Sequence, residues 1–338
     1  MIIALDAMGG DNAPLVTVEG ALLAAKEFDG KILLVGNEKL IMAELSKHRK
    51  RYDLPSLNID IVNTSEIITM DDHPAKAVRN KKDSSLAVCA KFVADKQADA
   101  FVSMGNSGAS MAAALFYLKR IEGVLRPTIG VTFPTVDRPV FIADMGTNVD
   151  CKPEHLVQFA IMSDVYCKHI MGIANPKIAL ASIGEESTKG NELSLATYKY
   201  LEKTNLNFIG NIEGREIPLA KANIVICDGF VGNIILKFGE GLSDFMFKII
   251  ARNLKKHPIA WAAFPFLWTT IKDLKKTVDY SEFGAVPLLG VNGVCMIGHG
   301  RSNKKAVKSA ILAANRNAGY DLASAIAEAI ANNGNYNG

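Results

Sequence analysis

The stretch MIIALDAMGGDNAP (1–14) joins a short apolar run directly to a glycine-rich turn, and this junction indicates the fold class. Residues 1–5 are nearly all apolar, which is typical of a strand buried on both faces of a parallel sheet. A helical pattern over 15–27 follows the turn. A buried strand, a tight turn and a helix form the repeating unit of an α/β protein.

The same alternation continues along the chain. Further strand-like runs are predicted at 31–36, 58–63, 99–103, 139–145, 177–183 and 223–228, and helices at 84–96, 107–120, 153–170 and 191–203. This order predicts a doubly wound α/β fold with a mostly parallel sheet. We expect a single α/β catalytic unit over 1–338, with a helical excursion at 240–280 where no strand pattern appears.

Composition limits the class of protein. Of 338 residues, 49% are hydrophobic and 22% are charged, which is ordinary for a globular protein and excludes disorder. The net charge of +3 gives no global signal for binding a polyanion such as nucleic acid. The five cysteines are scattered without a CxxC pair, which favours a reducing cytoplasm over a disulfide framework or a zinc site.

Four predicted strand ends are rich in glycine, asparagine and small polar residues: 5–14, 103–110, 182–192 and 227–233. Glycine lets the backbone approach a ligand closely, and a following helix offers free N–H groups to an anion. We therefore predict a phosphate or substrate site here, although each loop alone fits an ordinary tight turn equally well. The candidate binding residues are Asp6, Gly9, Gly10, Gly105, Asn106, Ser107, Gly108, Glu186, Asp228 and Gly232.

Two further residues in these loops could carry chemistry. Lys189 would supply a positive charge for phosphate, or be a solvated surface lysine. Asn233 could donate an N–H to a developing oxyanion, or cap the helix that follows. Cys227 could be a nucleophile, but a buried cysteine in the core is the more ordinary reading. His73 and His299 lack partners at ligand spacing, so no metal site is expected.

The stretch HPIAWAAFPFLWTTIKDLKK (257–276) is the most unusual segment of the sequence. It is too short to span a bilayer, and its prolines interrupt a regular helix. A core helix, a dimer interface and a tip that enters one membrane leaflet all fit it; the aromatic residues Trp261, Phe264, Phe266 and Trp268 favour the leaflet. The basic residues around it could meet anionic lipid or an acidic partner: Arg252, Lys255, Lys256, Lys272, Lys275 and Lys276.

Several motifs occur in order across nearly the whole chain: ALDAMGGDNAP, MDDHPAKAVRNKKDSS, GNSGA, GTNVDCKPEHLVQFA, GEESTKGNEL, CDGFVGNIILK and PLLGVNGVCMIGHG. Together they resemble the PlsX family, the bacterial acyl-carrier-protein:phosphate acyltransferases of phospholipid synthesis. The resemblance implies a Rossmann-like fold related to phosphotransacetylases and isocitrate-dehydrogenase-type enzymes. It also implies conversion of fatty acyl carrier protein and inorganic phosphate to acyl phosphate and free carrier protein, with no cofactor.

The resemblance implies further properties. By motif position, Lys189 and Asn233 are the expected catalytic residues. A homodimer is expected in the cytoplasm, attached peripherally to the inner face of the cell membrane, where a glycerol-3-phosphate acyltransferase would use the product. The alternatives are a short-chain phosphotransacetylase that uses a coenzyme A thioester, a nicotinamide-dependent decarboxylating dehydrogenase, and a non-enzymatic phosphate- or nucleotide-sensing scaffold.

Overall fold

The computed structural model describes residues 1–135, 137–256, 268–269, 272 and 284–333. Its centre is an eleven-stranded sheet in the order β3-β2-β1-β4-β11-β10-β5-β6-β9-β7-β8. The strands are β1 (Ile2–Asp6), β2 (Lys31–Gly36), β3 (Ile59–Asn63), β4 (Ala100–Ser103), β5 (Thr128–Phe133), β6 (Val140–Ala143), β7 (Ile178–Ser182), β8 (Phe208–Glu213), β9 (Ile224–Ile226), β10 (Ala285–Leu289) and β11 (Val294–Gly298).

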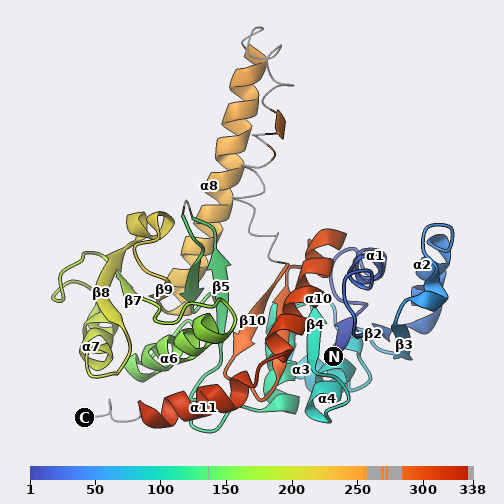
Figure 1. Cartoon of the computed structure of the whole chain (residues 1–338), viewed down its shortest axis with the longest axis horizontal. Coiled ribbons are helices and arrows are strands. Elements are labelled where there is room, and N and C mark those ends of the chain that lie inside the picture. The colour runs from blue at the N-terminus through green and yellow to red at the C-terminus, as the bar shows by residue number, and fades with distance from the viewer. Residues whose placement is uncertain (136, 257–267, 270–271, 273–283, 334–338) are drawn as a thin grey trace.

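Helices cover the sheet and connect its strands (Figure 1). They are α1 (Leu15–Ala24), α2 (Glu38–Lys47), α3 (Pro74–Asn80), α4 (Ser85–Ala94), α5 (Ser107–Ala113), α6 (Pro153–His169), α7 (Glu192–Leu201), α8 (Gly229–Lys256), α10 (Lys304–Ala318) and α11 (Leu322–Asn332). Shorter helical turns are η1 (Leu54–Ser56), η2 (Ala114–Leu118) and η3 (Gly214–Leu219).

Strand direction reverses across the middle of the sheet. Seven of the ten strand pairings are parallel, and the three antiparallel pairings follow one another in the order β11–β10–β5–β6. The strands on either side of this centre therefore run in opposite directions. Consequently, the carboxyl ends of β1, β4 and β11 point one way along the strand direction, and those of β6, β7 and β9 point the opposite way.

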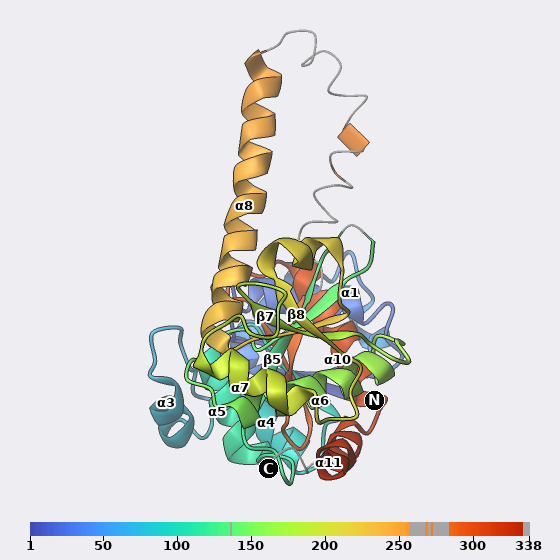
Figure 2. The same ribbon diagram turned by 90° about the vertical axis from the view of Figure 1, so that its left-hand side faces the viewer.

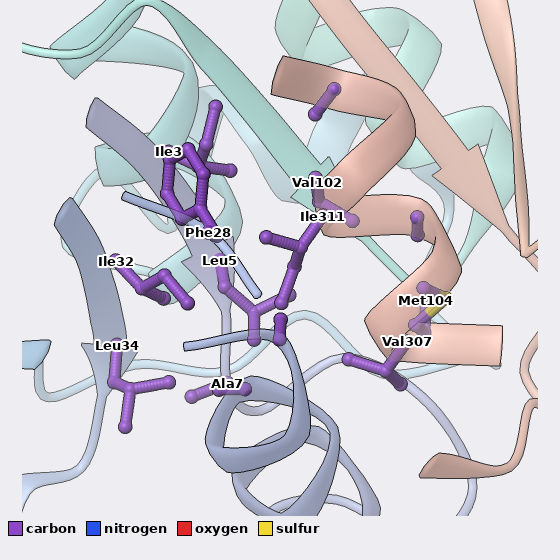
Figure 3. Close-up of a cluster of buried hydrophobic side chains, with 14 of the residues drawn as sticks. Ile3, Leu5, Ala7, Phe28, Ile32, Leu34, Val102, Met104, Val307 and Ile311 are labelled. Atoms are coloured by element: carbon purple, nitrogen blue, oxygen red, sulfur yellow. The ribbon is translucent and has the colours of Figure 1, made fainter. Parts of the chain in front are cut away.

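The core consists of four clusters of buried apolar side chains. The first joins β1, β2 and β4 to α1 and α10, with Ile3, Leu5 and Ile311 fully buried (Figure 3). The next residue along each strand, such as Ala4 on β1, points into a different cluster under α4 and α5. This alternation is the pleat of strands buried on both faces, as their continuous apolar sequences predict. The other two clusters repeat the arrangement around β6 and β9.

The predicted fold class is confirmed, as are all seven predicted strands and all five predicted helices, with boundary shifts of a few residues. Strands β5, β8, β10 and β11 were not predicted; each contains a glycine or a proline, which weakens the apolar pattern. The helical excursion begins earlier than predicted, at Gly229 rather than 240. Figures 1 and 2 show α8 extending well beyond the sheet.

Within the part of the chain that the structure describes, no helix combines the length and the apolar character that crossing a bilayer requires.

Candidate active site

Asp6 is the buried centre of the first group of loops. It ends β1 and is 3% exposed. Its carboxylate accepts hydrogen bonds from the hydroxyls of Ser85, at 2.6 Å, and Ser103, at 2.7 Å, and from the N–H of Met8. Burial raises the pKa of this carboxyl, and the hydrogen bonds partly oppose that rise. Asp6 therefore joins three segments, and its contacts are with the protein itself.

The glycines around Asp6 are required by close backbone contacts. A Cβ on Gly9 would lie 2.5 Å from the Asp6 carboxylate and 3.0 Å from the N of Gly105. Gly10 has a φ of +106°, a conformation that favours glycine. The N–H of Asp11 donates to the carbonyl of Gly300, which brings the loop after β11 to the same place. These loops therefore pack tightly together at one edge of the sheet.

Asn106 and Gly108 complete this group. The Asn106 side chain caps α5 by accepting from the N–H of Ala109, and its amide donates to the carbonyls of Met70 and Asp72. A Cβ on Gly108 would lie 2.8 Å from the Pro74 ring. Asn106 thus uses its side chain to hold the 69–73 segment. That segment belongs to the charged stretch 70–85, where Lys81 and Asp72 form an ion pair at 2.6 Å.

Asp144 is the buried centre of a second group of loops, and this role was not predicted from the sequence. It follows β6 and has no exposed surface. Its carboxylate accepts from the backbone and side-chain N–H groups of Asn148, from the N–H groups of Ile129 and Met145, and from the hydroxyl of Thr128. Burial raises its pKa too, against these hydrogen bonds. The only sequence signal was an acidic residue inside a predicted strand, 139–145.

Asn233 lies directly beside this second group. A Cβ built on Gly146, which has a φ of +102°, would lie 3.7 Å from the Asn233 amide oxygen. Gly232 lies so close to the loop that its added Cβ would be 1.9 Å from the backbone oxygen of Asp144. Asn233 is exposed in the first turns of α8. The alternative reading of Asn233 as a helix cap is wrong, because Asp228 holds that position and accepts from the N–H of Val231.

Lys189 and Glu186 belong to a third group, the loop after β7. The backbone N–H of Lys189 donates to the carbonyl of Glu186, and the carbonyl of Lys189 accepts from the Ser182 hydroxyl. The Asn211 amide also donates to the Glu186 carbonyl. Both side chains are exposed. Because β7 and β9 are parallel neighbours, the loop that contains Lys189 and the loop before Asn233 both follow the carboxyl ends of adjacent strands.

A cavity of about 600 Å³ joins the first two groups. Ser107 lines it from the first group, and Gly146 and Asn233 line it from the second. Apolar side chains of β5, β10 and β11 form much of the remaining lining, and the charged or titratable residues Lys237, Glu240, His299 and Arg316 line it as well. Lys189 is not among the described residues of its wall. The structure therefore brings together part of the predicted site, and the shared ligand of all four loops stays a prediction.

Cys227 is a buried core residue and not a suitable nucleophile. Its side chain is 3% exposed, and burial, reinforced by the charges of Asp144 and Asp228, raises the pKa of its thiol well above the usual value. A thiol that stays protonated is a poor nucleophile.

The predicted lipid and carrier contacts lie mostly outside the described residues: Trp261, Phe264, Phe266, Lys275 and Lys276 fall there. Among the rest, Trp268 is 54% exposed and Arg252, Lys256 and Lys272 are also exposed. Lys255 is in the last turn of α8. Large apolar side chains of α8 are exposed as well, among them Phe230, Ile234, Phe238, Leu242, Phe245 and Met246.

The fold is similar to that of solved phosphotransacetylases and of a putative 4-hydroxythreonine-4-phosphate dehydrogenase. A phosphotransacetylase from Streptococcus pyogenes matches 96% of this chain and 94% of its own with a TM-score of 0.58 at 18% identity. EutD phosphotransacetylase from Staphylococcus aureus matches 94% of each chain with a TM-score of 0.58 at 16% identity. A putative 4-hydroxythreonine-4-phosphate dehydrogenase from Salmonella typhimurium reaches 0.56 at 10% identity over 93% of this chain and 98% of its own.

Sequence comparison gives the particular family. Residues 1–324 match the model of the family described as "Fatty acid synthesis protein". A phosphate acyltransferase from Endomicrobium trichonymphae is 64% identical over 330 residues, 98% of each chain. Another, from Trichlorobacter lovleyi, is 47% identical over 98% of this chain and 95% of its own. The chain belongs to this fatty acid synthesis protein family, and the resemblance noted in its motifs is confirmed.

Proposed function

We propose that this chain is a phosphate acyltransferase that moves a fatty acyl group from acyl carrier protein to inorganic phosphate, as a step of phospholipid synthesis. The whole chain acts as one catalytic unit. The proposal rests on family membership and on one structural observation: Asn233 lines a largely apolar cavity at a loop edge of the sheet. A site that joins a polar amide to an apolar cavity suits a substrate with a reactive carbonyl and a hydrocarbon chain.

The reaction needs positioning more than strong acid or base catalysis. A phosphate oxygen attacks the thioester carbonyl carbon, a C–O bond forms, and the C–S bond breaks. The carrier thiolate leaves with the electron pair and takes a proton from solvent. Holding phosphate against the carbonyl makes the attack effectively unimolecular. No covalent acyl-enzyme is required, which agrees with the inert Cys227 thiol.

The residues divide these tasks between them. Asn233 donates its amide N–H to the oxyanion that forms on the thioester carbonyl. Lys189 neutralises phosphate, helped by backbone N–H groups of the glycine-rich loops. Asp6 and Asp228 are positioning residues, because their carboxylates accept hydrogen bonds from the protein. The remaining predicted binding residues shape the loops around the phosphate.

The test is acyl phosphate formation by purified variants. Asn233→Ala should lower kcat by about 10²-fold or more, since removal of one oxyanion donor has that effect. Lys189→Ala should also lower acyl phosphate formation strongly, because it removes the positive charge that neutralises phosphate. Asn233→Asp should be equally poor, because a carboxylate of the same size offers no N–H. Lys199→Ala, an exposed lysine on α7, is the matched control. Near wild-type turnover in a folded Asn233 or Lys189 variant removes that residue's assigned role.

The same assay separates the alternative functions. Transfer from a hexadecanoyl carrier protein, but not from acetyl coenzyme A, supports the proposed donor. The reverse preference identifies a short-chain phosphotransacetylase. If no thioester is consumed in a phosphate-dependent reaction, the remaining candidate functions are the dehydrogenase and the sensing scaffold.

The chain also forms a homodimer through α8 in this proposal. The exposed apolar side chains named above on α8 recur mostly every three or four residues, which places them along one face of the helix. Such a face on a helix that projects from the body is typical of an interface with a second copy. Phe238→Glu should produce a monomer in light scattering, whereas Phe116→Glu, another exposed phenylalanine on η2, should not. A dimeric Phe238→Glu variant would place the interface elsewhere.

The end of α8 and the segment after it are proposed to meet the membrane and the carrier protein. Exposed Arg252, Lys256 and Lys272 support an acidic partner or surface. Trp261→Glu with Phe264→Glu should abolish co-sedimentation with anionic vesicles and leave dimer and soluble activity intact. Loss of the dimer would instead identify an interface. For the carrier protein, added salt should raise KM; a flat response would contradict electrostatic steering.

A further inference from the structure

We propose that the cavity beside Asn233 is the binding site for the fatty acyl chain, and that the chain passes between the two halves of the sheet. This inference rests on the proposed function and names the part of the molecule that holds the hydrocarbon. Its physical basis is a gap in the sheet between β5 and β10.

The two strands separate because their pairing stops early. Only Leu288 with Ile129 and Leu289 with Thr128 are paired, although continued antiparallel pairing would match Val131 with Val286. Pro287 comes next on β10 and has no N–H to donate, so the ladder ends where it stands. Beyond that point, Val131 and Val286 line the cavity. Pro287 in the sequence of β10 therefore accounts for the opening between the two strands.

The cavity reaches both faces of the sheet. Asn233, Ser107 and Leu236 line it near the loops and α8, while Tyr166 and Met171, from α6 and the turn after it, line it on the opposite face. Its wall also includes members of all four apolar clusters, such as Met296, Tyr166, Ile297 and Val131. Ile129 and Val286 pack against two of these clusters at once.

A cavity at this place offers room for a ligand. Protein interiors are close-packed, and the side chains that line an empty space lose their packing contacts. A cavity of about 600 Å³ where four apolar clusters meet is within the size range of small-molecule sites. A chain whose thioester carbonyl lies at Asn233 would extend into this apolar lining. The pantetheine arm of the donor is polar and fits the lining less well.

The test makes the cavity smaller and varies the length of the acyl chain. Val131→Phe should place a ring in the cavity, since Val131 is a buried residue of its wall. Each methylene that loses its place costs roughly fourfold in kcat/KM. We therefore expect kcat/KM for a hexadecanoyl donor to fall at least about tenfold relative to a butanoyl donor. Val62→Phe, on a half-buried residue of the edge strand β3, is the matched control and should leave the ratio unchanged.

A second measurement separates this proposal from the proposed function. Calorimetric titration with hexadecanoate should show binding to the wild-type protein and to Val62→Phe, and weaker binding to Val131→Phe of unchanged melting temperature. The assignment would be overturned if Val131→Phe lowered kcat/KM equally for the hexadecanoyl and butanoyl donors, or left the ratio of the two values unchanged. It would also be overturned if Val131→Phe and Val62→Phe bound hexadecanoate with equal affinity. If the wild type transfers no acyl group at all, the proposed function fails, and the titration alone decides the cavity.

Discussion

The two halves of the sheet each contain one buried aspartate at the end of a strand, and the two differ in what donates to them. Two of the three donors to Asp6 are serine hydroxyls, from Ser85 and Ser103. Four of the five donors to Asp144 are N–H groups, two of them from Asn148. A hydroxyl can rotate and accept a hydrogen bond, whereas an N–H can only donate.

The two sets of donors hold the loops of their halves in different ways. Asp6 joins residues 79 and 97 positions away in the sequence, so it fastens separate segments with partners that can adapt. All five donors to Asp144 come from residues within four positions of it or from the adjacent strand β5. It fixes the backbone of a single loop, and this loop carries Gly146 beside Asn233. The second half therefore offers the more rigid support for the chemistry.

The largest effect is expected for Asp144→Asn compared with Asp6→Asn. Whichever way the introduced amide turned at position 144, its NH₂ would face N–H donors, leaving one or two buried groups unpaired at about 1–3 kcal/mol each. In Asp6→Asn the NH₂ can face Ser103, whose oxygen accepts, so the loss should stay below about 1 kcal/mol. Urea unfolding measures both. Equal losses in the two variants would contradict the distinction between hydroxyl and N–H donors.

A smaller effect separates Gly232→Ala from Gly105→Ala. The new Cβ at 232 would lie 1.9 Å from the backbone oxygen of Asp144, whereas at 105 its nearest neighbour is 3.3 Å away. Backbone cannot rotate aside, so Gly232→Ala should destabilise the protein by about 1–3 kcal/mol and lower kcat through displacement of Asn233. Gly105→Ala should cost less than that. Thermal unfolding and the acyl phosphate assay together check this; a Gly105→Ala loss as large as that of Gly232→Ala would show that both halves are equally rigid.

The smallest effect is on the pH dependence of stability. The pKa of Asp6 is raised above its ordinary value of 3.8 in the folded state, so its contribution to stability is full below that value and is lost as pH rises through the folded pKa. Asp6→Asn removes this contribution. The unfolding free energy of the variant, measured relative to wild type from pH 4 upward, should therefore rise and then level off. A difference that does not change with pH would mean that burial does not raise the Asp6 pKa.

Much of the fold could be predicted from local sequence. Continuous apolar runs such as 31–36 and 177–183 identified buried strands, because a strand covered on both faces needs no polar residue. The glycine-rich loops could also be predicted, because glycine is required at Gly9 and Gly10 by backbone geometry and close contacts. Strands β8 and β10 were missed because they mix apolar with polar or proline residues, and only their neighbours in the sheet make them strands.

From the sequence alone came the fold class, the family motifs and the position of Lys189 on a loop, whereas Asn233, expected on a loop, lies in the first turns of α8. The three-dimensional structure was needed to show that strand direction reverses at β10 and β5, and that Asp144 supports the loop beside Asn233. It alone decided that a cavity opens where the two strands separate. The physical reason is that hydrophobic periodicity reports only which faces of a segment are buried. Strand order, the partners of a buried carboxylate and the space left between strands depend on contacts between residues far apart in the chain.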